Sequence, residues 1–73
     1  MRAFEAFSHH IDMLFEQNPA GARRIVKEIK TACGISSAVY SNWRRGVTPI
    51  RKLQRAEITQ ILNYDLFKDV TDW

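Results

Sequence analysis

The 73 residues carry 45% hydrophobic side chains and a net charge of +3, which exclude a second domain, a deep substrate cleft and a disordered chain. The charge is unevenly divided, because residues 23–55 hold nine Lys or Arg and one acid, whereas the rest holds two basic and seven acidic residues. A polyanion is therefore expected to be attracted to one region, of net charge +8, and repelled by the remainder, of net charge −5, so the charge can orient such a partner.

The first predicted helix spans Ala3 to Gln17. Its apolar side chains recur at helical spacing and form one stripe: Phe4, Phe7, Ile11, Leu14 and Phe15. Asn18 and Pro19 indicate that this helix stops and another starts. Asn can accept hydrogen bonds from the first free amides of a helix, and Pro suits the first helical position because its missing N–H has no partner there in any case.

The second helix is expected from about Pro19 to Ala32. Its apolar stripe consists of Ala22, Ile25, Val26, Ile29 and, at the end, Cys33. Its opposite side carries the cations Arg23, Arg24 and Lys27. Gly34 is predicted to end the helix, because Gly adopts the left-handed conformation of a helix terminus with little steric penalty.

A third, short helix is predicted between Ser36, a favourable N-cap, and Gly46. At about 100° per residue its side chains separate into two faces. One face is apolar and needs burial: Val39, Tyr40 and Trp43. The other is small, polar or cationic and can approach another surface closely: Ser37, Ala38, Ser41, Asn42 and Arg45.

A fourth helix is predicted to begin between Pro49 and Leu53 and to end near Asn63. Its apolar side is expected to hold Ile50, Leu53, Ile58, Ile61 and Leu62. A helix continuous from Pro49 would place Glu57 in that stripe, so a start nearer Leu53, after an extended lead-in, fits better. In the tail, residues 64–73, one short helical turn is expected near residues 65–68. The predicted fold class is all-α, a bundle of four to five helices in one domain.

The segment from Gly34 to Gly46 resembles the helix-turn-helix of the λ-repressor/Cro-like (XRE-type) DNA-binding family, with the motif over about residues 20–45. The likeness is carried by Gly34, Ile35, Ser36, Tyr40, Trp43 and Gly46, and it extends over roughly residues 23–67. Two residues depart from the family pattern at the crossing of the two helices. Lys30 replaces a small residue, with its ammonium group expected in water, and Tyr40 replaces Ile or Val.

The resemblance implies that the third helix enters the major groove of double-stranded DNA and reads bases from its exposed face. The implied base-reading residues are Ser37, Ala38, Ser41, Asn42 and Arg45. Asn can pair with adenine and Arg with guanine through two hydrogen bonds each. The residues expected at phosphates, where contacts supply affinity without sequence information, are Arg23, Arg24, Lys27, Arg44, Thr48, Arg51 and Lys52. The alternative is that the exposed side of the third helix and these cations contact only solvent and bind no DNA.

The expected function is that of a small bacterial or phage transcriptional regulator, acting as a homodimer. The tail is the candidate dimer surface, through Tyr64, Leu66, Phe67, Val70 and Trp73; alternatively Trp73 folds back onto the first helix. A rival hypothesis is a protein-interaction module with the same fold that never reads DNA.

Other function classes find little support in the sequence. No catalytic constellation is evident, so the chain is not expected to be an enzyme, and no cofactor or small-molecule ligand is implied. The adjacent His9 and His10 diverge on a helix and predict no metal site. No apolar run approaches the roughly 18 residues that span a bilayer, and the single cysteine, Cys33, fits a reducing compartment, so a cytoplasmic protein is expected.

Overall fold

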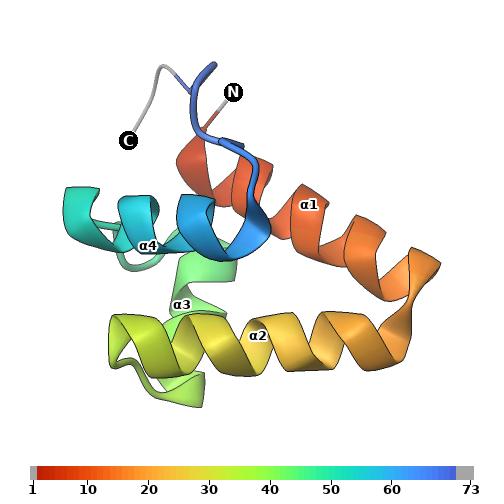
Figure 1. Ribbon diagram of the computed structural model, residues 1–73. Coiled ribbons are helices and arrows are strands. Elements are labelled where there is room, and N and C mark those ends of the chain that lie inside the picture. Colours follow the sequence, from red (N-terminus) through yellow and green to blue (C-terminus); the bar gives the residue numbers. More distant parts are fainter. Residues whose placement is uncertain (1, 71–73) are drawn as a thin grey trace.

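A computed structural model describes residues 2–70, and their regular structure consists of four α-helices (Figure 1). The first two, α1 (Ala3–Gln17) and α2 (Pro19–Cys33), meet in a corner at Asn18. The Asn18 side chain accepts a hydrogen bond from the Gly21 amide at 3.2 Å, and Pro19 occupies the first helical position. The predicted boundary is confirmed, and α2 is one residue longer than expected.

The turn after α2 leads into the short helix α3 (Ser37–Arg45). Gly34 has a φ of 64°, the left-handed conformation, and the next amide, of Ile35, donates to the Lys30 carbonyl at 3.0 Å. Ser36 then caps α3, because its hydroxyl oxygen accepts from the Val39 amide at 3.2 Å. Each local signal therefore does what its residue type predicts.

The last helix, α4 (Lys52–Leu62), begins after an extended lead-in. Ile50 lies in this lead-in and is buried, and the Arg51 amide donates to the Gln54 side chain at 3.1 Å, which stabilises a start at Lys52. Glu57 is exposed, so the later start is confirmed.

The prediction for Leu53 was wrong: 82% of it is exposed. The buried side of α4 is centred on Ile58, with Ile61 and Leu62 packed beside it. Leu53 precedes Ile58 by five positions and therefore points about 140° away from it around the helix.

The core lies where the helices converge. Both α1 and α4 pack against α2, and α1 also packs against α3. The largest fully buried side chains are Trp43, Phe7, Ile11, Ile29 and Ile58. The Phe7 ring meets the rings of Tyr40 and Trp43 edge to face, with centroid distances of 6.0 and 6.1 Å. The ring-bearing face of α3 is thus turned inward, as predicted.

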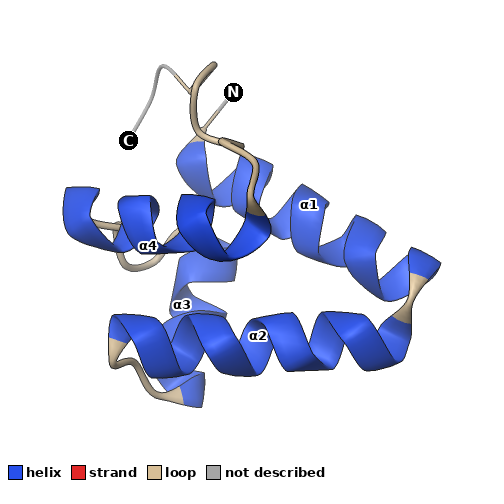
Figure 2. Ribbon diagram, in the orientation of Figure 1, coloured by secondary structure: helices blue, strands red, loops and turns tan. Residues whose placement is uncertain are grey.

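The tail forms turns at residues 66–69 in place of a fifth helix, as the secondary-structure colouring shows (Figure 2). The Val70 amide donates to the Phe67 carbonyl at 3.1 Å, and Phe67 is buried in the core. Phe67 is therefore covered by its own chain, which contradicts its placement on a dimer surface. Leu66 and Val70 also pack against the core, and Trp73 lies outside the described residues.

Gly34 and Gly46, which end α2 and α3, allow a matched test of how closely Phe4 packs against the end of α3. Both have positive φ, but a Cβ on Gly46 would lie 2.6 Å from the Phe4 ring, whereas a Cβ on Gly34 meets nothing within 4 Å. We expect Gly34→Ala to destabilise the fold by about 1 kcal/mol and Gly46→Ala by about 2–4 kcal/mol, as measured by urea denaturation. The excess at position 46 should disappear in a Phe4→Ala background, and equal losses at both glycines would contradict the packing.

Candidate nucleic-acid interface

The candidate interface is the outward face of α3. Ser37, Ala38, Ser41 and Arg45 are exposed and Asn42 is half-buried, while Trp43 on the opposite face is only 1% exposed. The predicted base-reading residues therefore share one accessible side of α3, and the opposite, aromatic side of this helix is packed into the core. Most of them are short, so the helix backbone can come close to a flat or grooved partner.

Asn42 and Arg45 form one unit at the end of this face. The Arg45 Nη2 donates to the Asn42 Oδ1 at 2.7 Å. The contact is exposed, so it contributes little stability. It holds an amide and a guanidinium side by side, the two groups best suited to make paired hydrogen bonds with purine bases. Sequence spacing indicated their shared face, but this hydrogen bond was not foreseen.

Lys30 and Tyr40 contact each other where α2 meets α3. The Lys30 Nζ donates to the Ser37 hydroxyl at 3.2 Å and lies 5.9 Å from the centre of the Tyr40 ring. The contact is exposed, so the ammonium group lies at the surface, as expected, and is also hydrogen-bonded to α3. Burial raises the pKa of Tyr40, an effect that the charge and the hydrogen bond of Arg44 partly offset.

The predicted phosphate-binding residues surround α3 unevenly. Lys27 borders a shallow hollow together with Lys30, Ser36 and Ser37, so it lies beside the start of α3. Thr48 borders another hollow with Gly46, just beyond the end of α3.

The other exposed cations lie on α2 or at the start of α4. Arg23 and Arg24 are on α2, and Arg51 precedes α4. Lys52 faces a separate hollow with Asp65 and Phe67, next to the tail. The structure thus brings Lys27 and Thr48 to the two ends of α3 and places Lys52 against the tail.

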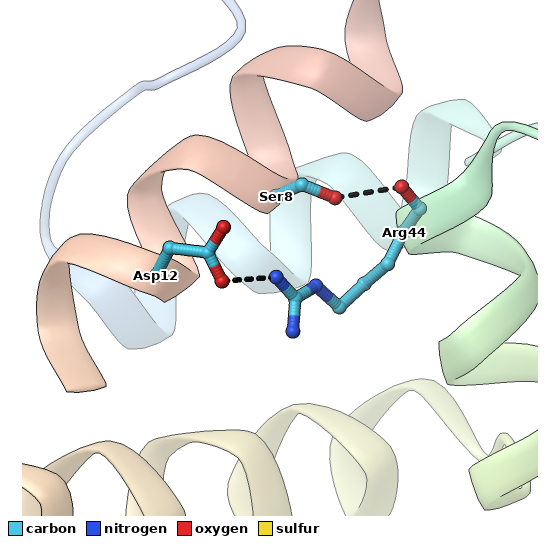
Figure 3. Close-up of polar contacts among 3 residues, drawn as sticks. All are labelled: Ser8, Asp12 and Arg44. Carbon is cyan, nitrogen blue, oxygen red and sulfur yellow. Dashed lines mark hydrogen bonds and ion pairs between the residues drawn. The ribbon is translucent and has the colours of Figure 1, made fainter.

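Arg44 is arranged differently from the other cations (Figure 3). Its guanidinium forms an ion pair with Asp12 of α1, and its backbone carbonyl accepts a hydrogen bond from the Ser8 hydroxyl at 2.7 Å. Its side chain is 29% exposed. Arg44 is therefore engaged within the protein, unlike the exposed cations with which it was grouped. Asp12 and Ser8 were missed, because 32 and 36 residues separate them from Arg44.

Two other described residues with shifted pKa values, Cys33 and His10, lie outside this face. The Cys33 thiol lies 3.9 Å from the Gln54 carbonyl, and burial, followed by the charge of Glu57, raises its pKa. His10 stacks on Tyr64 with ring centres 5.6 Å apart, and burial lowers its pKa. In residues 2–70 no three His, Cys, Asp or Glu side chains are grouped to hold a metal ion. None of the described helices has both the length and the apolarity to cross a membrane.

In comparisons with known proteins the chain matches no family model, no curated protein and no solved structure. Any proposal about function is therefore supported by the residues, their placement and their charges.

Proposed function

We propose that the chain binds double-stranded DNA sequence-specifically, as a small transcriptional regulator in which α2 and α3 form a helix-turn-helix. The observation that supports this most strongly is the exposed face of α3, which ends in the Asn42–Arg45 unit and lies within the basic part of the chain. A short helix with small residues along one side fits a major groove about 12 Å wide.

The chemistry of this face suits purine bases. The Asn42 amide offers a donor and an acceptor that match adenine, and the Arg45 guanidinium offers a pair of donors that match guanine. The hydrogen bond between them uses one lone pair of Asn42 Oδ1, which leaves the second lone pair and the amide N–H groups for a base. Ser37, Ala38 and Ser41 permit close approach, including contact with a thymine methyl group.

The exposed cations would hold the phosphates on either side. Without Arg44, five charged candidates remain: Arg23, Arg24, Lys27, Arg51 and Lys52. If all five contact phosphates, the logarithm of affinity should fall with the logarithm of salt concentration with a slope of about −4.5. A homodimer on two-fold related half-sites would follow the usual arrangement of helix-turn-helix proteins.

Arg24→Ala is expected to weaken binding to every duplex by a similar factor and to flatten the salt slope by about one unit. The physical reason is that one fewer counterion is released when one phosphate contact is lost. Fluorescence anisotropy across a salt series measures both effects. Lys68→Ala removes an exposed positive charge outside the basic region of residues 23–55 and serves as the matched control. An equal change in both variants would show that only net charge matters.

One observation favours the rival function, an interaction module for a protein partner. Met13 and Tyr64 are exposed and border the same groove between α1 and the tail. The same salt series separates the two functions, because the rival predicts no duplex binding even at low salt.

A further inference from the structure

We infer that Asp12 is a positioning residue for DNA recognition: held to Arg44, it sets the orientation of α3 and so determines base preference without touching DNA. This inference rests on the proposed function and concerns a residue of α1, outside the helix pair that would contact DNA.

Besides the packing of Phe7 on Trp43, two polar contacts connect α1 to the last turn of α3, and both end on Arg44 (Figure 3). The Ser8 hydroxyl donates to the Arg44 carbonyl at 2.7 Å, and Asp12 pairs with the Arg44 guanidinium. Ser8 and Asp12 are four residues apart, so they lie on the same side of α1. One contact holds the backbone of α3 and the other holds its side chain, which restrains both the position and the rotation of the helix end.

This restraint acts next to the base-reading unit. Arg44 directly precedes Arg45 and follows Asn42 by two positions. The start of α3 is held separately, by the Ser36 cap and by the hydrogen bond from Lys30 to Ser37. Paired hydrogen bonds to bases need side chains placed within roughly 0.5 Å and 10–20° of the productive geometry. Without the ion pair the last turn of α3 is still held by the Ser8 hydrogen bond and by Trp43 packing on Phe7, but the Arg44 side chain no longer restrains the rotation of the helix end.

The surroundings of Arg44 favour this role over a phosphate contact. Its Nε is buried and has no hydrogen-bond partner within residues 2–70, and its side chain is only 29% exposed. The ion pair with Asp12 also offsets the positive charge that a phosphate contact would use. The two roles predict different effects of removing the Asp12 carboxylate. If Arg44 contacts a phosphate, removal of the carboxylate should strengthen binding to all duplexes. If Asp12 positions α3, its removal should reduce only the difference in affinity between preferred and scrambled duplexes.

The test compares Asp12→Asn with Glu16→Gln. Glu16 is an exposed acid on the same helix, so both variants remove one negative charge from α1. Dissociation constants are measured for the preferred duplex and for a scrambled duplex of equal length, at a temperature where circular dichroism shows both variants fully folded. We expect both variants to bind the scrambled duplex alike. Only Asp12→Asn should lower the ratio of preferred to scrambled affinity, by about 3- to 30-fold.

Two further variants exclude a merely structural effect. Asp12→Glu keeps the charge and should retain most of the ratio. In an Arg44→Gln background, Asp12→Asn should change the ratio no further, because the partner through which Asp12 acts is absent. An unchanged ratio in Asp12→Asn would overturn the inference. So would tighter binding to both duplexes with a steeper salt slope than in Glu16→Gln, which would make Arg44 a phosphate contact.

A DNA-free measurement distinguishes failure of this inference from failure of the proposed function. Amide hydrogen exchange in the last turn of α3 should be faster in Asp12→Asn than in Glu16→Gln. If the unmodified protein binds no duplex, the proposed function fails, and the role of Asp12 in base preference fails with it. Exchange that is unchanged while duplex binding persists would overturn the positioning role alone.

Discussion

Trp43→Ala is expected to lower the free energy of unfolding by about 3–5 kcal/mol, the range for truncating a large buried aromatic residue. Trp43 is 1% exposed and meets the Phe7 ring edge to face, at the point where α3 packs on α1. Small domains have a total stability of only about 5–15 kcal/mol, so the variant should lose a large share of it and unfold at a lower urea concentration. Urea denaturation followed by circular dichroism measures the loss.

Leu53→Ala is the matched control for this substitution. Leu53 is also a large apolar residue near a helix end, but it is 82% exposed, so its truncation should change stability by less than about 0.5 kcal/mol. A Trp43→Ala variant that unfolds at the same urea concentration as the unmodified protein, yet no longer binds duplexes, would contradict the core placement of Trp43.

Asn42→Ala and Arg45→Ala are each expected to weaken binding to the preferred duplex by about 1–3 kcal/mol and to relax preference at one base position. Binding to scrambled duplexes should change little in Asn42→Ala. Because the two side chains are hydrogen-bonded to each other, removal of one also frees the other, and the double variant should lose less than the sum of the single losses. Anisotropy titrations against single-base variants of the preferred duplex measure these effects.

Gln60→Ala, an exposed polar residue on α4, controls for general surface effects and should leave the base preference unchanged. Equal losses on all sequences in Asn42→Ala would show that Asn42 contacts the backbone and reads no base. Strict additivity of the two substitutions would show that Asn42 and Arg45 act independently and that the hydrogen bond between them does not contribute to recognition.

Local signals explain why the helices could be predicted from the sequence. Asn18, Gly34 and Ser36 act on amides and carbonyls within a few residues, so their positions alone place the ends of α2 and the start of α3. The inward face of α3 likewise follows from the spacing of Tyr40 and Trp43, because the apolar arc of an amphipathic helix must be buried.

The remaining features depend on how distant segments meet. Arg44 looked like the neighbouring cations, because nothing in its own segment indicates that Asp12 lies opposite. Spacing places Leu53 and Ile58 on different sides of α4, and the packing of α4 against α2 decides which of the two is buried. The contact between Lys30 and Ser37 depends on the crossing of α2 and α3, which local spacing does not determine.

Selection of bound duplexes from a random pool by the full chain tests DNA recognition by α3 most directly. The proposed function predicts enrichment of one sequence that contains an adenine for Asn42 and a guanine for Arg45. This sequence should be repeated in two half-sites about one helical turn apart. Enrichment should be lost when Asn42 and Arg45 are both replaced by Ala. A pool that remains random at low salt would contradict the proposal, and so would enrichment that survives the double replacement.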